Sequence, residues 1–428
     1  MNLIDRDFDE LLIKKTNRST RFDFSSTLKK RRHDLDFTLA EASEGICSLS
    51  YLSKVENNQL APSSDVIADL MEKLSIPEDI FKRPLVDISM SEIGLMFLRE
   101  DVKVIEDIRK KLKSNVFLYP EVLLETCLAL INKKYLEAKN FLETIAFVAS
   151  SLNFEQLYFY LLLVIAYDVK RAKLEEVKGL FKVAQKHLGD NEVFKLLLTV
   201  LRLEYHYQNG SVPTDFREVE QLIITNRRFL SPRNNNNSEA IFTILKEGAN
   251  ALDELKILYQ HDYTRPDFGY LLNALLENNR FKEIHDLISS IPFEPDHVLY
   301  LGIACLREGR NRRMSYYVTT NYNLYLEYFK KAYSMQLDPE IKIFMRLFDY
   351  HLNPKNTGIK SYLFCRDVIL PYLRSYQRRF IFSFFFEEFV KSVGDSSHYK
   401  SLYLLFIKHR WLFDYCDYHE TLSQKYFS

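Results

Sequence analysis

Glycine and proline are scarce in this chain, and this scarcity limits its possible folds more than any other feature. The 428 residues include 11 glycines and 12 prolines, where average usage would give about 30 and about 20. Tight turns and strand connections depend on both residues, whereas proline interrupts helices. Hydrophobic residues make up 47% of the chain, which is enough for a large core. We therefore predict an all-α protein.

Several classes of protein do not fit the sequence. No run of apolar residues is long enough to span a bilayer, and the segment Met1–Asp7 lacks the basic start and apolar core of a signal peptide. The cysteines are odd in number and far apart, which argues against a disulfide framework or a zinc site. They are Cys47, Cys127, Cys305, Cys365 and Cys416. We expect reduced thiols and a cytoplasmic location.

Positive charge is concentrated near the N-terminus, although the 58 Lys and Arg balance the 58 Asp and Glu overall. Between residues 11 and 33, eight basic residues stand against Asp23 alone. They are Lys14, Lys15, Arg18, Arg21, Lys29, Lys30, Arg31 and Arg32. Local positive charge of this kind either contacts nucleic-acid phosphates or forms a solvated basic surface.

The segment from Phe37 to Glu56 predicts two short helices joined by a tight turn at residues 45–47. Thr38 and Glu41 have the spacing of a capping box at the start of the first helix. Ser48 is placed to cap the second helix, in which Leu52 and Val55 would face inward. A helix-turn-helix inserts its second helix into the DNA major groove in this arrangement.

Flanking residues extend the prediction to four helices. Ser25 and Ser26 are expected to cap a first helix that ends near His33, with Phe24 and Leu28 buried. A fourth helix is expected over 66–74 after Pro62 and Ser63. We expect Glu56 to pair with Arg31 or Arg32. The candidate DNA contacts are Thr38, Ser48, Leu49, Ser50, Tyr51, Lys54, Asn57 and Asn58, with Lys29 and Arg32 from the first helix.

These residues resemble a known class of DNA-binding domain. The element Ser53-Lys54-Val55-Glu56, followed by a polar loop and Pro62-Ser63, is similar to the helix-turn-helix of the Cro/C1-like (XRE) class. The short turn over 42–47 is closer to the Rgg/PlcR/NprR (RRNPP) peptide-pheromone regulators. The position after the Thr cap is often Gln in this class and is Leu39 here. The resemblance implies a lambda-repressor-like domain that binds double-stranded operator DNA.

From about residue 85 onward the chain reads as a succession of amphipathic helix pairs, such as 120–131 with 135–148 and 267–278 with 281–290. Leu301-Gly302 and Phe329-x-x-Ala332 resemble the two helices of a tetratricopeptide (TPR) repeat. We expect seven to nine pairs over 85–428 in a TPR-like α-solenoid. The run Asn234–Asn237 after Pro232 predicts a loop tip.

A TPR-like solenoid offers a concave groove that suits an extended peptide. Its candidate contacts are Asn153, Tyr167, Arg202, Tyr270, Asn273 and Tyr300. Each of them can equally be a packing or solvated residue. The aromatic-rich region 360–415 is expected to form a final core or a dimer surface.

We expect three parts, namely a basic extension over 1–23, a helix-turn-helix domain over 24–78 and a TPR-like domain over 79–428. No nucleotide, metalloprotease or hydrolase motif occurs, so we expect no enzyme, cofactor or metal. The resemblance implies a cytoplasmic, homodimeric transcription regulator that senses a short signalling peptide in quorum sensing. Two alternatives stay open. One is a TPR interaction scaffold with weak or vestigial DNA binding, and the other is a regulator that senses no peptide.

Overall fold

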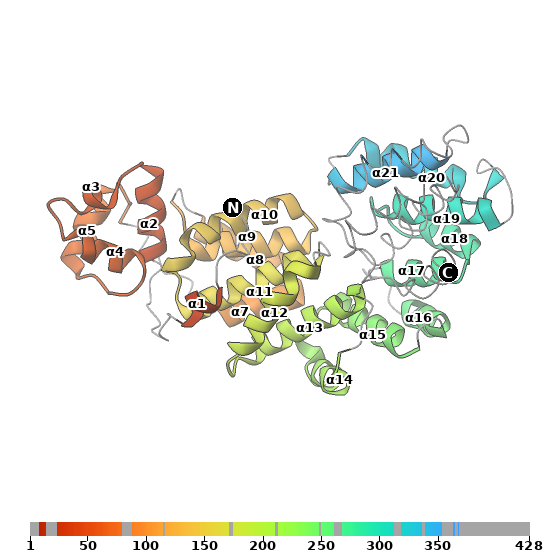
Figure 1. The fold of residues 1–428 in the computed structure, drawn as a ribbon, viewed down its shortest axis with the longest axis horizontal. Coiled ribbons are helices and arrows are strands. Elements are labelled where there is room, and N and C mark those ends of the chain that lie inside the picture. The colour runs from red at the N-terminus through yellow and green to blue at the C-terminus, as the bar shows by residue number, and fades with distance from the viewer. Residues whose placement is uncertain are drawn as a thin grey trace. The chain divides into compact units, whose positions relative to one another are not determined.

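The structure is a computed structural model that describes residues 8–13, 24–78, 88–113, 116–170, 174–209, 213–247, 250–260, 268–311, 318–335, 339–352, Leu363 and Asp367. Helices form all of the regular secondary structure in these ranges, and none of the described residues lies in a strand (Figure 1). The predicted all-α class is therefore confirmed. The aromatic-rich region 360–415 falls outside the described residues, apart from Leu363 and Asp367.

The helices follow one another with short connections. They are α1 (Phe8–Ile13), α2 (Phe24–Asp34), α3 (Leu39–Ser43), α4 (Leu49–Glu56), α5 (Ser64–Lys73), α7 (Met90–Arg99), α8 (Val102–Leu112), α9 (Tyr119–Ile131), α10 (Tyr135–Val148), α11 (Phe154–Lys170), α12 (Leu174–Lys186), α13 (Glu192–Asn209), α14 (Phe216–Thr225), α15 (Pro232–Glu247), α16 (Ala251–Gln260), α17 (Gly269–Glu277), α18 (Phe281–Ser290), α19 (His297–Asn311), α20 (Tyr322–Tyr333) and α21 (Pro339–Leu352). Two short 3₁₀ helices are η1 (Ala149–Ser151) and η2 (Arg227–Phe229).

The chain divides into two compact units. The first contains residues 1–170, 175–202 and 221–234, and the second contains 171–174, 203–220 and 235–428. The first unit therefore includes α1 to α12, together with the start of α13. The second includes α16 to α21.

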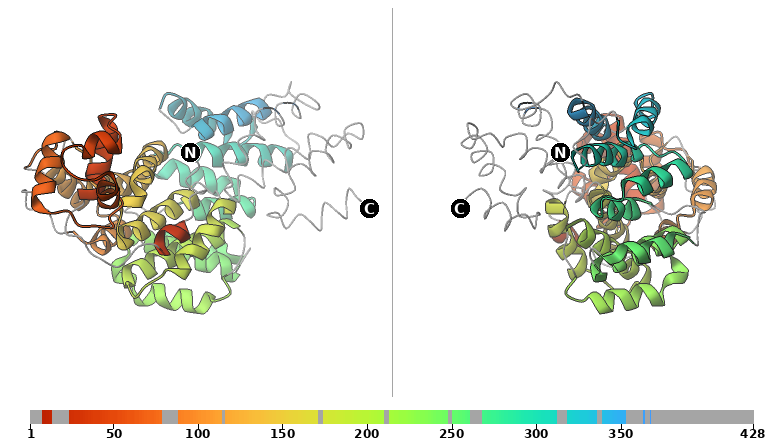
Figure 2. Two further views of the ribbon diagram at one scale, coloured as in Figure 1. Left: turned by 60° about the vertical axis from the view of Figure 1, so that its left-hand side comes forward. Right: turned by 90° about the vertical axis from the view of Figure 1, so that its right-hand side faces the viewer.

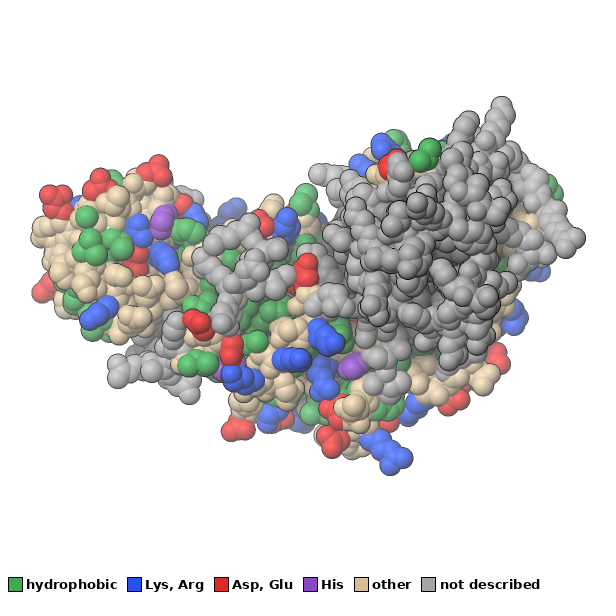
Figure 3. Space-filling model, in the orientation of Figure 1, with side chains coloured by type: hydrophobic (Ala, Val, Ile, Leu, Met, Phe, Trp, Pro, Cys, Tyr) green, Lys and Arg blue, Asp and Glu red, His purple; other side chains and the backbone are tan. Residues whose placement is uncertain are grey.

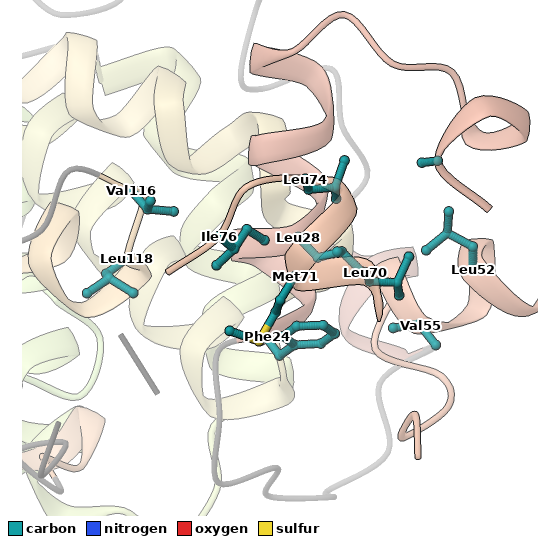
Figure 4. Packing of buried hydrophobic residues seen from close by; sticks show 11 residues of the cluster. Phe24, Leu28, Leu52, Val55, Leu70, Met71, Leu74, Ile76, Val116 and Leu118 are labelled. Carbon is teal, nitrogen blue, oxygen red and sulfur yellow. The ribbon is translucent and has the colours of Figure 1, made fainter. Parts of the chain in front are cut away.

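Helices α2 to α5 share one hydrophobic core in the first unit. Phe24 and Leu28 of α2 pack with Leu52 and Val55 of α4, as the sequence predicted, and with Leu70 of α5 (Figure 4). The cluster also takes in two apolar residues that precede α9, namely Val116 and Leu118. The Oγ1 hydroxyl of Thr27 donates to the carbonyl of Phe117 over 3.0 Å and joins α2 to the same segment. The core thus extends beyond residue 78, where the sequence placed a domain boundary.

Helix ends in this chain use residues other than glycine in the left-handed conformation. Six non-glycine residues in the described part have positive φ, and each follows the end of a helix by one or two residues. They are Asp36, Asn58, Ser75, Glu100, Lys133 and Asn279, with φ from 51° to 59°. At Asn58, for example, the next residue donates its backbone N–H back to the carbonyl of Lys54 over 2.8 Å. This Schellman pairing satisfies the last carbonyls of a helix, so helices end here with little use of glycine.

Helix pairs occur where the amphipathic pattern predicted them. The expected pairs correspond to α9 with α10, α17 with α18, and α19 with α20. Small residues lie where helices meet, because Gly302 of α19 faces Phe348 of α21 with no room for a side chain. A Cβ atom on Gly302 would lie 2.7 Å from Cγ of Phe348. Ala332 on α20 is likewise buried.

The asparagine run at 234–237 was predicted as a loop tip, and this prediction was wrong. It lies in the first turns of α15. Ser231 accepts a hydrogen bond from the backbone N–H of Asn234 over 2.9 Å, and Pro232 occupies the first helical position. A serine cap followed by proline is a strong helix start. Here it outweighs the low helix propensity of asparagine.

The short helix α1 packs against α11 within the first unit (Figure 2). Phe8 and Leu12 are buried, and the ring of Phe8 lies 5.6 Å from that of Tyr160. Asp9 accepts hydrogen bonds from Lys186 at 2.7 Å and pairs with His187 at 2.6 Å. The described part of the expected basic extension is therefore an acidic helix. Its basic residues Lys14, Lys15, Arg18 and Arg21 fall outside the described residues.

Candidate nucleic-acid interface

The register of α4 decides which of its side chains face outward. Leu52 and Val55 are fully buried, which turns the opposite side of the helix toward solvent. Ser48 caps the helix, as predicted, because its Oγ accepts a hydrogen bond from the backbone N–H of Tyr51 over 3.1 Å. Of the residues predicted to contact DNA, this register exposes Ser48, Leu49, Ser50 and Lys54 and leaves Tyr51 half-buried.

The start of α3 is fixed by the capping box that the sequence predicted. The backbone N–H of Thr38 donates to the Glu41 carboxylate over 2.7 Å, and the backbone N–H of Glu41 donates to the Thr38 hydroxyl over 3.2 Å. These hydrogen bonds from the backbone and side chain of Thr38 lower the pKa of Glu41. Thr38 is exposed, and its hydroxyl already serves the helix start.

The turn between α3 and α4 is tight because Gly45 adopts φ 78°, a conformation that costs glycine little. The backbone N–H groups of Ile46 and Cys47 both donate to the carbonyl of Ser43 over 3.0 Å. The turn falls at 45–47, where the sequence placed it. It holds the start of α4 at a fixed position after α3.

Arg32 anchors the far end of α4 to α2. Its Nε and Nη2 atoms bind the two carboxylate oxygens of Glu56 at 2.6 and 2.9 Å, and Nη1 donates to the carbonyl of Phe37 over 2.8 Å. Arg32 and Glu56 are 6% and 3% exposed. The expected pairing of Glu56 with a basic residue of the first helix is therefore present. Because Arg32 is buried, its guanidinium does not reach the outer surface where a DNA phosphate would lie.

Lys29 also lies away from the exposed side of α4. Its Nζ atom donates to the Ser150 hydroxyl of η1 over 2.6 Å. Next to Arg32, His33 packs edge-on against the ring of Phe147 with 4.5 Å between the ring centroids. Burial, and then the neighbouring charge of Arg32, lower the pKa of His33. Lys29 and His33 thus connect α2 to α10 and η1 within the first unit.

Asn57 and Asn58 close the C-terminal end of α4. The Asn57 side-chain amide donates to the carbonyl of Ser53 over 2.9 Å. Asn58 takes the left-handed conformation that ends the helix, which asparagine adopts more readily than most residues. Both are half-buried. Their structural roles explain a polar pair at this position without excluding a contact from their exposed parts to DNA.

The charge on this segment is uneven. Exposed acidic residues lie on or beside α3 and on α5, and Figure 3 shows acidic side chains around the margin of the segment. They are Glu41, Glu44, Asp65, Asp69 and Glu72. Lys73 donates to the backbone carbonyl of Glu44 over 2.7 Å. Lys54 is therefore the cation that α4 itself presents to solvent, and its neighbours on that side are hydroxyls and Leu49.

The six residues predicted to bind a peptide fall into both units. In the first unit, Asn153 caps α11 through a hydrogen bond of 2.9 Å from the backbone N–H of Gln156. Tyr167 is buried in α11, and Arg202 is half-buried in α13. In the second unit, Tyr300 is buried in α19. The sequence did not distinguish these packing and capping roles from ligand contacts.

The structure brings Tyr270 and Asn273 together on α17, facing α13. The Tyr270 hydroxyl donates to the carboxylate of Glu204, and the Asn273 amide donates to the Tyr207 hydroxyl over 2.9 Å. Gln208 donates to the other oxygen of Glu204 over 2.8 Å. Sequence reasoning missed the α13 members of this polar cluster. Glu204, Tyr207 and Gln208 share one face by their spacing of three and four residues, and this spacing was the available signal.

Comparison with protein-family models, with curated proteins and with solved structures finds no match to the chain. Within the described ranges, every helix is too short or too polar to cross a membrane. The same ranges contain no group of three or more His, Cys, Asp or Glu side chains arranged to hold a metal ion.

Proposed function

We propose that α2 to α5 form a lambda-repressor-like helix-turn-helix domain that binds operator DNA, and that the chain is a cytoplasmic transcription regulator. The observation that carries this proposal is the fixed presentation of α4. The Ser48 cap, the buried Leu52 and Val55, and the Arg32–Glu56 pair hold this helix at both ends. Its outward residues are hydroxyls, Leu49 and Lys54, which are groups that recognise base edges and phosphates.

The helices after α5 support the second part of the proposal, a TPR-like α-solenoid that dimerises. Antiparallel helix pairs follow one another from α9 onward, and the close approach of Gly302 to Phe348 is the packing that small residues allow in such repeats. In a symmetric dimer, two copies of α4 would meet half-sites about 34 Å apart or a multiple of that distance.

We further propose that the solenoid senses a short peptide. The polar cluster of Glu204, Tyr207, Tyr270 and Asn273 supports this idea, because amides, hydroxyls and a carboxylate match the donors and acceptors of a peptide backbone. A peptide would shift the regulator between two states only by its difference in affinity for them.

The test of DNA binding is fluorescence anisotropy of the full-length protein on DNA from upstream of its own gene, over a range of salt concentrations. Tyr51→Ala and Lys54→Ala are expected to weaken specific binding and leave the protein folded. Lys54→Ala should also reduce the salt slope by about one unit. Lys139→Ala removes an exposed lysine from α10 instead and serves as the matched control. Unchanged affinity in both α4 variants would contradict the proposed recognition helix.

The same assay tests the peptide when a low-mass filtrate of spent culture medium is added. A change in specific binding supports a peptide sensor, and indifference to the filtrate favours a regulator that senses no peptide. The second candidate function is a TPR interaction scaffold, favoured by the excess of acidic residues around α3 and α5. Weak binding without sequence preference would favour the scaffold.

A further inference from the structure

Leu49 is an exposed apolar residue at the first position of α4. Its side chain is 52% exposed, whereas Leu52, three residues later on the same helix, is fully buried. Leu49 does not belong to the hydrophobic cluster that holds α2 to α5 together. The cap of the helix is supplied by Ser48, and its inward register is supplied by Leu52 and Val55. The fold therefore does not need a large apolar side chain at this position.

The surroundings of Leu49 indicate what covers it. Ser48 and Ser50 flank it in the chain, and Lys54 lies on the same exposed side of α4. A solvent-facing leucine among hydroxyls and a cation suits a polar, negatively charged partner that carries one small apolar group. A large apolar protein surface would instead call for further exposed apolar residues on this helix, and α4 offers none beyond half-buried Tyr51.

The DNA major groove contains such a group. The C5-methyl of thymine is the apolar feature among the base edges there, and the other edges present hydrogen-bond donors and acceptors. Leucine has neither a donor nor an acceptor, so it discriminates among bases only through this methyl group. The first residues of a recognition helix are the ones that meet base edges.

We infer that Leu49 is a specificity-determining residue that selects thymine in each half-site by contact with its C5-methyl group. This inference rests on the proposed DNA-binding function. It adds that sequence preference comes partly from an apolar contact and does not depend on hydrogen bonds alone.

The experiment starts with selection of binding sites by the full-length protein from a library of random duplexes. Each thymine of the selected duplex is then replaced singly by deoxyuridine, which removes one methyl group and preserves base pairing. Burial of one methyl group predicts about fourfold weaker binding when the contacted thymine is replaced. The other replacements should change the affinity by less than twofold.

The protein variants complete the cycle. Leu49→Ala should bind the thymine and deoxyuridine duplexes with equal affinity. Leu60→Ala truncates another exposed leucine, in the loop after α4, and should retain the fourfold difference. Circular dichroism checks that both variants are folded, and the deoxyuridine replacements themselves require no protein variant.

The outcomes separate the two proposals. Sequence-specific binding with no sensitivity to any methyl group, or a methyl effect that persists in Leu49→Ala, would overturn the role of Leu49 and leave DNA recognition by α4 intact. Failure of the selection to enrich any sequence would overturn both. Loss of self-association in Leu49→Ala, without loss of methyl discrimination, would assign this side chain to a contact between copies of the chain.

Discussion

Arg32 and Glu56 are 24 residues apart in sequence, and their side chains form a two-bonded ion pair with contacts of 2.6 and 2.9 Å. The pair is almost completely buried and joins α2 to the last residue of α4. A buried charge whose partner is removed is strongly destabilising, whereas loss of both partners can be nearly neutral. The orientation of α4 therefore depends on both members of this pair.

Removing one member of the pair should unfold the segment more readily than removing both. Glu56→Gln or Arg32→Met is expected to lower the free energy of unfolding by about 3–5 kcal/mol. The double variant Arg32→Met/Glu56→Leu should recover most of that loss. Urea unfolding followed by circular dichroism measures all three. Additive losses in the double variant would show that the two side chains are not coupled.

Gly302 should not tolerate even one added methyl group. Gly302→Ala places a Cβ atom against the ring of Phe348, and overpacking of this kind costs about 1–3 kcal/mol. Gly179→Ala is the matched control, because Gly179 lies inside α12 with no atom within 4 Å of the added Cβ. It should stabilise the protein by up to about 1 kcal/mol. Thermal unfolding distinguishes the two, and equal effects would refute the close approach of α19 and α21.

A left-handed helix end should improve when glycine replaces the native residue. Ser75 follows α5 with φ 51°, and Ser75→Gly is expected to stabilise the protein by about 1 kcal/mol because glycine avoids the Cβ clash. Ala68→Gly changes an exposed position inside the same helix. It should destabilise by about 1 kcal/mol. Chemical denaturation of both variants gives the sign. A loss of stability in Ser75→Gly would contradict the assigned conformation.

Docking of α1 should weaken in acid. Hydrogen bonds from Lys186 and then His187 lower the pKa of Asp9 from its ordinary value of 3.8. A lowered pKa in the docked state means that the carboxylate stabilises docking above pH 3.8 and that this contribution disappears as the pH falls through the lowered pKa. Hydrogen exchange of residues 8–13, corrected for the intrinsic rate, should speed up in that range.

The same exchange measurement at neutral pH tests the carboxylate directly. Asp9→Asn should speed exchange in α1, and Glu10→Gln, which alters an exposed neighbour, should have a smaller effect. Equal protection in Asp9→Asn and the native protein would mean that the buried side chains of Phe8 and Leu12 alone hold this helix in place.

The sequence predicted the local features of the candidate site well. The Thr38–Glu41 capping box, the Ser48 cap and the inward side of α4 all depend on residues within four positions of one another. Such interactions follow from helix geometry alone. The sequence could not choose between Arg31 and Arg32 as the partner of Glu56, because the angle at which α2 crosses α4 decides it.

Contacts between distant residues were beyond the sequence. Lys29 was expected to face DNA, yet it binds Ser150, 121 positions away. Asn153 and Tyr270 were chosen as ligand contacts, and their polar groups make capping or interhelical hydrogen bonds. In each case a side chain of the right chemistry for a ligand has an internal partner that only tertiary packing brings near it.

The six left-handed helix ends have an evolutionary consequence. Each is a position where a change to glycine would relieve backbone strain without touching the core. The present sequence therefore lies below the stability that its own backbone permits, as natural sequences commonly do. One such change could offset a destabilising substitution elsewhere, for example on the outer side of α4, and so widen the range of operator-reading residues that this protein could acquire.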